Sequence, residues 1–181
     1  MERNYKIFNK NSKILEIGAG NYPHIKHLKH NFESYHVLDL DENNSLKEFY
    51  ETNYKHINFN YYDGENIELE KKYFDRIIIS HCLEHVNYPE KLLLNLQKYL
   101  SKDGILSISL PTDPGIMWRT GRYFSKKLIQ KKTHGLSEED YDYINAIEHV
   151  NSIFNLLIIL KKNFSLVSEL YFPFYFKFPD L

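Results

Sequence analysis

Two glycines follow a short apolar run near the start of the chain, in the stretch Lys-Ile-Leu-Glu-Ile-Gly-Ala-Gly at residues 13–20. Glycine lacks a Cβ, so it tolerates positive φ and lets a flat ligand lie against the backbone. A turn between a strand and a helix also presents unpaired N–H groups toward a ligand. These residues at this spacing indicate a site for a nucleotide-type cofactor. A plain glycine turn after a core strand is the alternative.

The spacing differs from the fingerprint of dinucleotide-binding proteins. That fingerprint is G-x-G-x-x-G, in which the third glycine allows close packing of helix and strand. Here Gly18 and Gly20 are present, Pro23 occupies the third position, and Glu16 precedes the first glycine by two residues. The difference disfavours a nicotinamide cofactor.

Acidic residues end the next two predicted strands. Asp39 lies about 20 residues after Gly18, the separation at which an acidic residue meets a ribose in this type of fold. Asp41 and Glu42 are rivals for that role, and a solvated loop carboxylate is the other alternative. Asp63-Gly64 follows the strand after it, where a simple turn is the competing interpretation.

The stretch at residues 74–86 is Phe-Asp-Arg-Ile-Ile-Ile-Ser-His-Cys-Leu-Glu-His-Val, followed by a helix that begins at Pro89 and by Lys-Asp-Gly at 102–104. His81, Glu84 and His85 match the H-x-x-E-H motif of certain zinc proteases. A zinc site of that kind needs both histidines one turn apart on a helix. Since the motif directly follows a predicted strand, no metal site is expected.

Together, residues 13–111 resemble the class I S-adenosylmethionine (SAM)-dependent methyltransferases, in motif order and in spacing. The resemblance implies SAM as cofactor and S-adenosylhomocysteine as its product. It implies that Glu16 helps orient the glycine loop and the methionyl ammonium, that Asp39 binds the ribose, and that Asp63 binds the adenine amino group. The full set of implied cofactor-binding residues is Glu16, Gly18, Ala19, Gly20, Asn21, Asp39, Leu40, Asp63, Gly64, Ser80, His81 and Leu83.

The acceptor site is expected under residues 111–150, beyond the carboxyl ends of the strands. The candidate catalytic residues there are Asp113 and His149, with His81 in reserve, because an oxygen acceptor needs a base. Arg119 and Arg122 are candidates to bind a phosphate or carboxylate of the acceptor, and Tyr143 is a further substrate-binding candidate. A helical lid with a solvated basic face and a surface histidine are the alternatives.

The order of predicted elements indicates an α/β fold with a doubly wound, mostly parallel, Rossmann-like methyltransferase sheet and helices on both faces. Strands are expected at 13–17, 35–40, 57–62, 74–80 and 105–110, and helices at 23–30, 45–52, 89–100 and 139–163. A lid insertion follows the fifth strand, and a further strand is expected at 164–172. Residues 1–181 are expected to form one domain, with a cofactor-binding core at 13–111 and a substrate-side lid at 111–150.

The amino-acid composition limits the kinds of partner that the protein is expected to bind. The 181 residues contain 23 Lys and Arg and 24 Asp and Glu, so no global positive charge favours nucleic acid. The chain has one cysteine, no apolar N-terminal run, and no apolar stretch near the ~20 residues of a membrane span, so a cytoplasmic protein without membrane contact is expected. The aromatic run at 171–176 suits a homodimer interface, with a buried strand as the alternative. The abundance of Asn, Lys and Ile suggests a bacterial source.

The expected function is SAM-dependent methyl transfer, with O-methylation as the favoured reaction. The expected acceptor is a small anionic molecule that carries a phosphate or carboxylate, with sugar- or nucleotide-linked compounds among the candidates. A catalytically silent SAM-binding module is the alternative, and a nicotinamide-dependent oxidoreductase is a weaker one. Nucleic-acid methylation is disfavoured by the near-neutral charge and by the lack of an Asn/Asp-Pro-Pro-aromatic motif.

Overall fold

The computed structural model describes residues 2, 12–40, 45–62, 69–112, 115, 120–121, 123–124, 137–166 and 168–171. The chain divides into two compact units, which are described separately. The first unit comprises Met1–Cys82 and Lys91–Ser109, and the second comprises Leu83–Glu90 and Leu110–Leu181.

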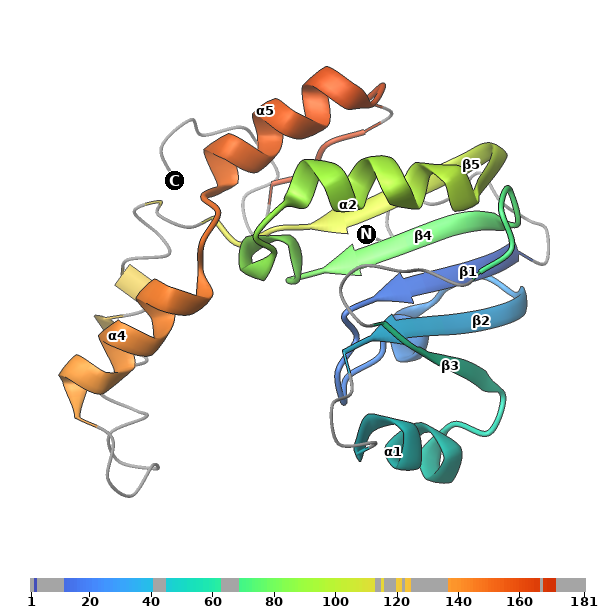
Figure 1. Ribbon diagram of the computed structural model, residues 1–181, viewed down its shortest axis with the longest axis horizontal. Helices are drawn as coiled ribbons and strands as arrows, with labels where there is room; N and C mark the ends of the chain where they lie inside the picture. The colour runs from blue at the N-terminus through green and yellow to red at the C-terminus, as the bar shows by residue number, and fades with distance from the viewer. Residues whose placement is uncertain are drawn as a thin grey trace. The chain divides into compact units, whose positions relative to one another are not determined.

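The first unit is built on a five-stranded sheet with the order β3-β2-β1-β4-β5 (Figure 1). Its strands are β1 (Ser12–Ile17), β2 (Phe32–Asp39), β3 (Ile57–Tyr61), β4 (Phe74–Ser80) and β5 (Leu100–Ser109). All four pairings are parallel, which confirms the predicted parallel sheet. The strand order reverses between β1 and β4. In open α/β sheets, ligands bind at the carboxyl ends of the strands at such a reversal.

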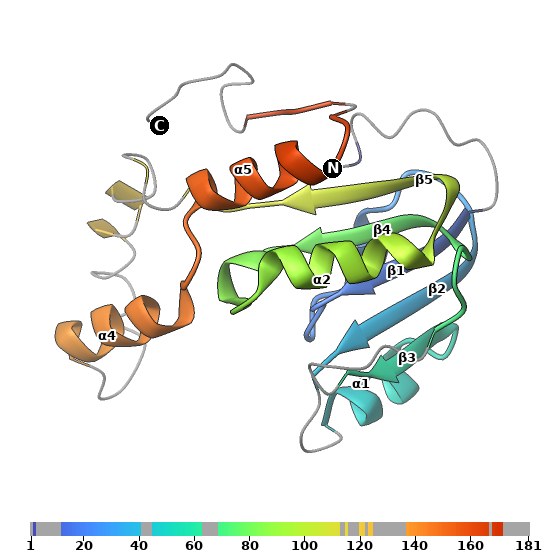
Figure 2. The ribbon, with the colours of Figure 1, turned by 45° about the horizontal axis from the view of Figure 1, so that its top comes forward.

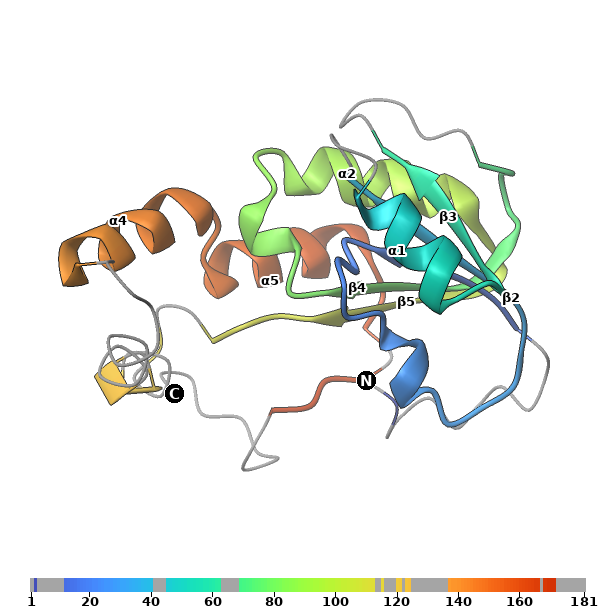
Figure 3. The same ribbon diagram turned by 90° about the horizontal axis from the view of Figure 1, so that it is seen from below.

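Both faces of the sheet are apolar, as a parallel sheet requires. One face carries a buried cluster to which the helix α1 (Ser45–Asn53) contributes Tyr50. The sheet's part of this cluster is Ile14, Tyr35, Val37, Ile57 and Ile78. Since side chains alternate along a strand, Leu15, Ile17, Leu38, Ile77 and Ile79 face the other way, and all of them are buried. The helix α2 (Pro89–Leu96) and the short turn η1 (His24–His27) lie on opposite sides of the sheet (Figure 3).

The predicted helix at 23–30 is wrong, because only the single 3-10 turn η1 forms there. β2 begins at Phe32, three residues before the predicted start at Tyr35, so little chain remains between the glycine loop and the sheet. Leu28 is already extended, with φ −60° and ψ 135°, and ends the turn. The helix at 45–52 is confirmed as α1.

The predicted helix at 89–100 ends early. α2 stops at Leu96, the 3-10 turn η3 (Gln97–Tyr99) follows, and β5 begins at Leu100. Asp103 and Gly104, which follow the predicted helix in the sequence, therefore lie inside β5. Leu100 pairs with Phe74 and Ile105 with Arg76, so β5 advances five residues while β4 advances two. The extra residues form a bulge at the start of the strand.

In the second unit, the predicted helix at 139–163 is two helices, α4 (Glu138–Glu148) and α5 (Ile153–Asn163), joined by a short non-helical link (Figure 2). Ser152 between them is extended, and its side chain accepts a hydrogen bond from the backbone of Asn155 at 3.3 Å. This N-cap starts α5 as a new helix.

The predicted strand at 164–172 is also wrong for the part that is described, because 164–166 and 168–171 form no strand. Residues 113–114, 116–119, 122 and 125–136 of the predicted lid, and the aromatic residues after Tyr171, lie outside the described residues. Among the helices within the described ranges, none is long and apolar enough to span a membrane.

Candidate functional site

The glycine loop begins where β1 ends, and both glycines have the left-handed backbone that favours this residue, with φ +67° at Gly18 and +52° at Gly20. A Cβ on Gly18 would lie 2.7 Å from Sγ of Cys82, so no larger residue fits there. A Cβ on Gly20 would meet no atom of the described residues within 4 Å. The backbone at Gly20 therefore faces open space, as a ligand that lies against the loop requires.

Asp39, at the end of β2, ties the glycine loop to its neighbouring strand. Its Oδ2 accepts a hydrogen bond from the amide of Gly20 at 2.7 Å, and its Oδ1 accepts one from Leu40 at 2.8 Å. The amide of Gly18 also donates to the carbonyl of Leu38 at 3.0 Å. Asp39 thus lies beside the glycine loop at the end of β2, where an acidic residue meets a ribose in this type of fold.

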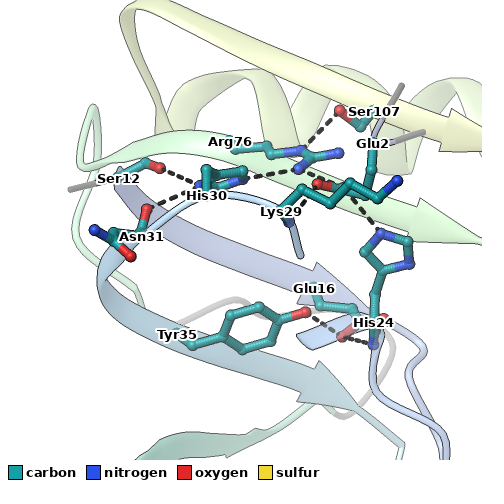
Figure 4. A network of polar contacts seen from close by, with 10 residues as sticks. All are labelled: Glu2, Ser12, Glu16, His24, Lys29, His30, Asn31, Tyr35, Arg76 and Ser107. Carbon is teal, nitrogen blue, oxygen red and sulfur yellow. Dashed lines mark hydrogen bonds and ion pairs between the residues drawn. The ribbon is translucent and has the colours of Figure 1, made fainter. Parts of the chain in front are cut away.

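Glu16 lies at the end of β1, just before the loop, and is only 2% exposed. The backbone N–H of His24 donates to both of its oxygens, at 3.0 and 2.9 Å, and the hydroxyl of Tyr35 donates to Oε2 at 2.6 Å (Figure 4). Burial raises the pKa of the Glu16 carboxyl, and the hydrogen bonds from Tyr35 and His24 oppose that rise. Glu16 therefore joins η1 to the sheet, which fits the loop-orienting role expected of it.

Tyr50 supports the loop from α1. Its hydroxyl donates to the carbonyl of Gly20 at 2.9 Å. Burial, together with the nearby carboxylates of Glu16 and Asp39, raises the pKa of Tyr50, so the hydroxyl keeps its proton and remains a donor. The sequence gives no signal for Tyr35 or Tyr50, because a tyrosine with one bonded hydroxyl looks like any other core aromatic residue.

At the end of β4, Ser80 is followed by His81, which has a left-handed backbone with φ +50°. Its amide donates to the carbonyl of Ser109 at 3.1 Å, and its Nε2 lies 3.4 Å from the hydroxyl of Ser109. Such a conformation is costly for a residue with a Cβ and is found disproportionately at functional sites. His81 thus presents an exposed imidazole at the carboxyl end of the sheet, next to the strand reversal.

In the second unit, the 3-10 turn η2 (Leu83–His85) is held by the break between α4 and α5. Nδ1 of His85 donates to the carbonyl of Glu148 at 2.9 Å, and the rings of His85 and His149 meet edge to face with centroids 4.9 Å apart. The side chain of Asn151 donates to the carbonyls of Leu83 at 3.1 Å and Val86 at 2.5 Å. His85 is therefore a hydrogen-bonding residue of the loop.

The H-x-x-E-H stretch contains no helix that would place its histidines one turn apart, since residues 83–85 form only η2. Within the described ranges, no three His, Cys, Asp or Glu side chains gather as a metal ion would require.

The first unit thus brings most of the predicted cofactor residues to one edge, the carboxyl ends of β1, β2 and β4. These are Glu16, Gly18, Ala19, Gly20, Asn21, Asp39, Leu40, Ser80 and His81. The second unit contains Leu83, which is fully buried, Tyr143, whose side chain is exposed on α4, and His149. Asp63, Gly64, Asp113, Arg119 and Arg122 lie outside the described residues.

The charge at this edge tests which cofactor fits. Two carboxylates, Glu16 and Asp39, flank the glycine loop, and Asp39 contacts its backbone directly. The carboxylate of Asp39 lies where a ribose binds in this type of fold, and SAM carries such a ribose. The open space before Gly20 and these carboxylates fit SAM.

Comparison with known proteins agrees with this chemistry. The sequence profile of the family described as "Methyltransferase domain" matches residues 1–153. A malonyl-[acyl-carrier protein] O-methyltransferase of Bacillus cereus is 33% identical over 99 residues, which are 54% of this chain and 36% of the relative. The matched part of the chain thus spans about a third of that relative's length.

Two solved structures share the fold. A phosphoethanolamine N-methyltransferase 2 of Haemonchus contortus, in complex with S-adenosyl-L-methionine, is similar with a TM-score of 0.57 and 16% identity, over 88% of this chain and 34% of that one. A SAM-dependent methyltransferase of Thermotoga maritima is similar with a TM-score of 0.54 and 16% identity, over 84% of this chain and 63% of that one. From the profile match over most of its length, the chain belongs to the methyltransferase-domain family.

Proposed function

We propose that this chain is a SAM-dependent methyltransferase. It transfers the methyl group of SAM to an oxygen of a small anionic acceptor that carries a carboxylate or a phosphate. The observation that carries the proposal is a run of basic residues after the fifth strand. From Arg119 to Lys132 the sequence holds two arginines and four lysines and no acidic residue. Arginine binds carboxylates and phosphates through two parallel hydrogen bonds, so Arg119 and Arg122 are the residues proposed to hold the acceptor.

The Bacillus cereus relative supports an oxygen acceptor, because its name describes O-methylation of a malonyl group. A malonyl group attached at one end has a free carboxylate at the other. Since the similarity is 33% over 99 residues, it supports the class of acceptor and not that substrate.

SAM, when bound, supplies a methyl group activated by the positive sulfonium. The acceptor oxygen forms a bond to the methyl carbon as the carbon–sulfur bond breaks, and the electron pair of that bond leaves with S-adenosylhomocysteine. A carboxylate or phosphate oxygen is already ionised, so the protein needs only to align it and exclude water. A hydroxyl acceptor would need a base as well, and His149, Asp113 and His81 are the candidates.

The test separates acceptor binding from cofactor binding. The double variant Arg119→Ala/Arg122→Ala should raise KM for the anionic acceptor by about tenfold or more and leave the calorimetric Kd of S-adenosylhomocysteine unchanged. Asp39→Ala should instead weaken the binding of S-adenosylhomocysteine. Acceptors are screened for methylation as matched sets of carboxylates, phosphates and neutral hydroxyl compounds.

Two controls accompany the screen. Lys161→Ala/Lys162→Ala removes the same charge from the end of α5, and Asp103→Ala removes an exposed carboxylate from the bulge of β5. Both should keep wild-type kinetics. Efficient turnover of neutral acceptors alone, or an unchanged KM in the arginine double variant, would contradict an anionic acceptor.

A further inference from the structure

The segment between the glycine loop and β2 has little hydrophobic anchorage. η1 contains no fully buried residue, and the residue before it, Pro23, forms no side-chain capping bond. Ile25 and Leu28 are only partly buried against the core. A single 3-10 turn also has few hydrogen bonds of its own. Polar contacts from elsewhere in the unit must therefore fix this segment.

Glu2 supplies such contacts at both ends of the segment (Figure 4). Its Oε1 accepts a hydrogen bond from Nε2 of His24 at 3.0 Å, and its Oε2 accepts one from the backbone N–H of Lys29 at 3.3 Å. The Glu2 side chain is only 7% exposed. One carboxylate thus holds the first residue of η1 and the chain just after it.

Arg76 fixes Glu2 in turn. The Arg76 side chain is fully buried on β4, and its Nη1 lies 2.7 Å from Oε1 of Glu2, the short distance of a charge-assisted bond. Nε of the same guanidinium donates to Ser107 on β5 at 3.0 Å, and Nη1 also donates to Nε2 of His30 at 3.1 Å. β4, β5 and His30 fix the position of the guanidinium. The ion pair with Arg76 therefore fixes the Glu2 carboxylate relative to the sheet.

His24 connects this pair to the cofactor loop. While its ring donates to Glu2, its backbone N–H donates to Glu16, which lies at the end of β1, two residues before Gly18. The contacts therefore run without interruption from Arg76 through Glu2 and His24 to Glu16.

We propose that Glu2 is a positioning residue for the SAM site: it transfers the fixed position of buried Arg76 to His24, and His24 holds Glu16 and the glycine loop in the conformation that binds cofactor. This role concerns cofactor binding and does not depend on which acceptor is methylated.

The test is a double-mutant cycle read out as the Kd of S-adenosylhomocysteine by calorimetry. Glu2→Gln and His24→Ala should each raise Kd by about tenfold, equal to about 1.4 kcal/mol. The double variant should bind S-adenosylhomocysteine no more weakly than the weaker-binding single variant, because both changes break the same connection. Glu33→Gln is the matched control. Glu33 forms a surface ion pair with Lys13 at 3.7 Å, and the Kd of this variant for S-adenosylhomocysteine should equal that of the wild type.

Two results would overturn the proposal. The first is a roughly hundredfold effect in the double variant, the product of two independent effects, which would mean that Glu2 does not act through His24. The second is a wild-type Kd in either single variant. His24→Ala keeps the pair between Glu2 and Arg76, so it tests the role even if Glu2→Gln does not fold.

Discussion

At the scale of single residues, the two glycines of the loop have different tasks. Both have positive φ, which costs an alanine roughly 1–2 kcal/mol. At Gly18 a methyl group would also collide with Cys82, whereas at Gly20 it would enter open space. We therefore expect Gly18→Ala to lower the free energy of unfolding by about 3 kcal/mol or more, and Gly20→Ala by about 1–2 kcal/mol.

Cofactor binding should distinguish these variants further. Gly20→Ala, which remains folded, should bind S-adenosylhomocysteine at least tenfold more weakly, because its methyl group occupies the space before the loop. Gly18→Ala/Cys82→Ala removes the sulfur and should recover part of the stability lost in Gly18→Ala. Urea unfolding and calorimetry measure both quantities. Wild-type affinity in Gly20→Ala would show that no ligand lies against that backbone.

At the scale of elements, Asn151 determines where one helix ends and the next begins. Its side chain donates to two carbonyls of the loop at 83–86, and its backbone N–H donates to Glu84 at 3.1 Å. Asn151→Ala leaves two carbonyls without this donor, so we expect a loss of about 1–3 kcal/mol in the free energy of unfolding. Asn155→Ala, four residues along on an exposed face of α5, is the control and should be near neutral.

The same substitution tests whether this anchor positions His149. If it does, Asn151→Ala should also lower the rate of methyl transfer more than it changes the Kd of S-adenosylhomocysteine. Equal stability of Asn151→Ala and Asn155→Ala would contradict the anchoring role.

The elements also show how far sequence reasoning reaches. Ile14, Leu15 and Ile77–Ile79 are apolar on both faces of a strand, and this pattern predicted β1 and β4 within one residue. The motifs around Gly18, Asp39 and Ser80 were placed at the correct edge of the sheet, because parallel strands bring their carboxyl ends together.

The predictions that were wrong, the helices at 139–163 and 23–30, depend on contacts between residues that are distant in sequence. The helical pattern at 139–163 is continuous, but Asn151 bonds the loop 65 residues earlier and interrupts it. The turn after Pro23 is short because β2 begins early, and its position depends on Glu2, which is 22 residues from His24. Local periodicity cannot detect either contact.

At the scale of the whole molecule, the contact between Glu2 and Arg76 makes the stability of the fold depend on pH in the acidic range. Burial opposes ionisation of Glu2, but the hydrogen bond from His24, the charge and hydrogen bond of Arg76, and the Lys29 amide outweigh it and lower the pKa of Glu2 from 4.5 to about 2. A lowered carboxyl pKa means that the unfolded chain binds more protons at acidic pH. The stabilisation is thus complete above about pH 5 and is lost as the pH falls toward 2.

The shift corresponds to up to about 3 kcal/mol at neutral pH. We expect Glu2→Gln to be less stable than the wild type, and this difference in unfolding free energy to shrink by about 1 kcal/mol between pH 6 and pH 4, because the wild type loses the contribution of Glu2. Urea unfolding of both proteins at the two pH values measures it. Buried Glu16, whose pKa is raised, acts in the opposite sense and is present in both proteins. A difference in unfolding free energy that is the same at both pH values would show that the ionised form of Glu2 does not stabilise the fold. Glu33→Gln, which removes an exposed carboxylate, gives the baseline for that comparison.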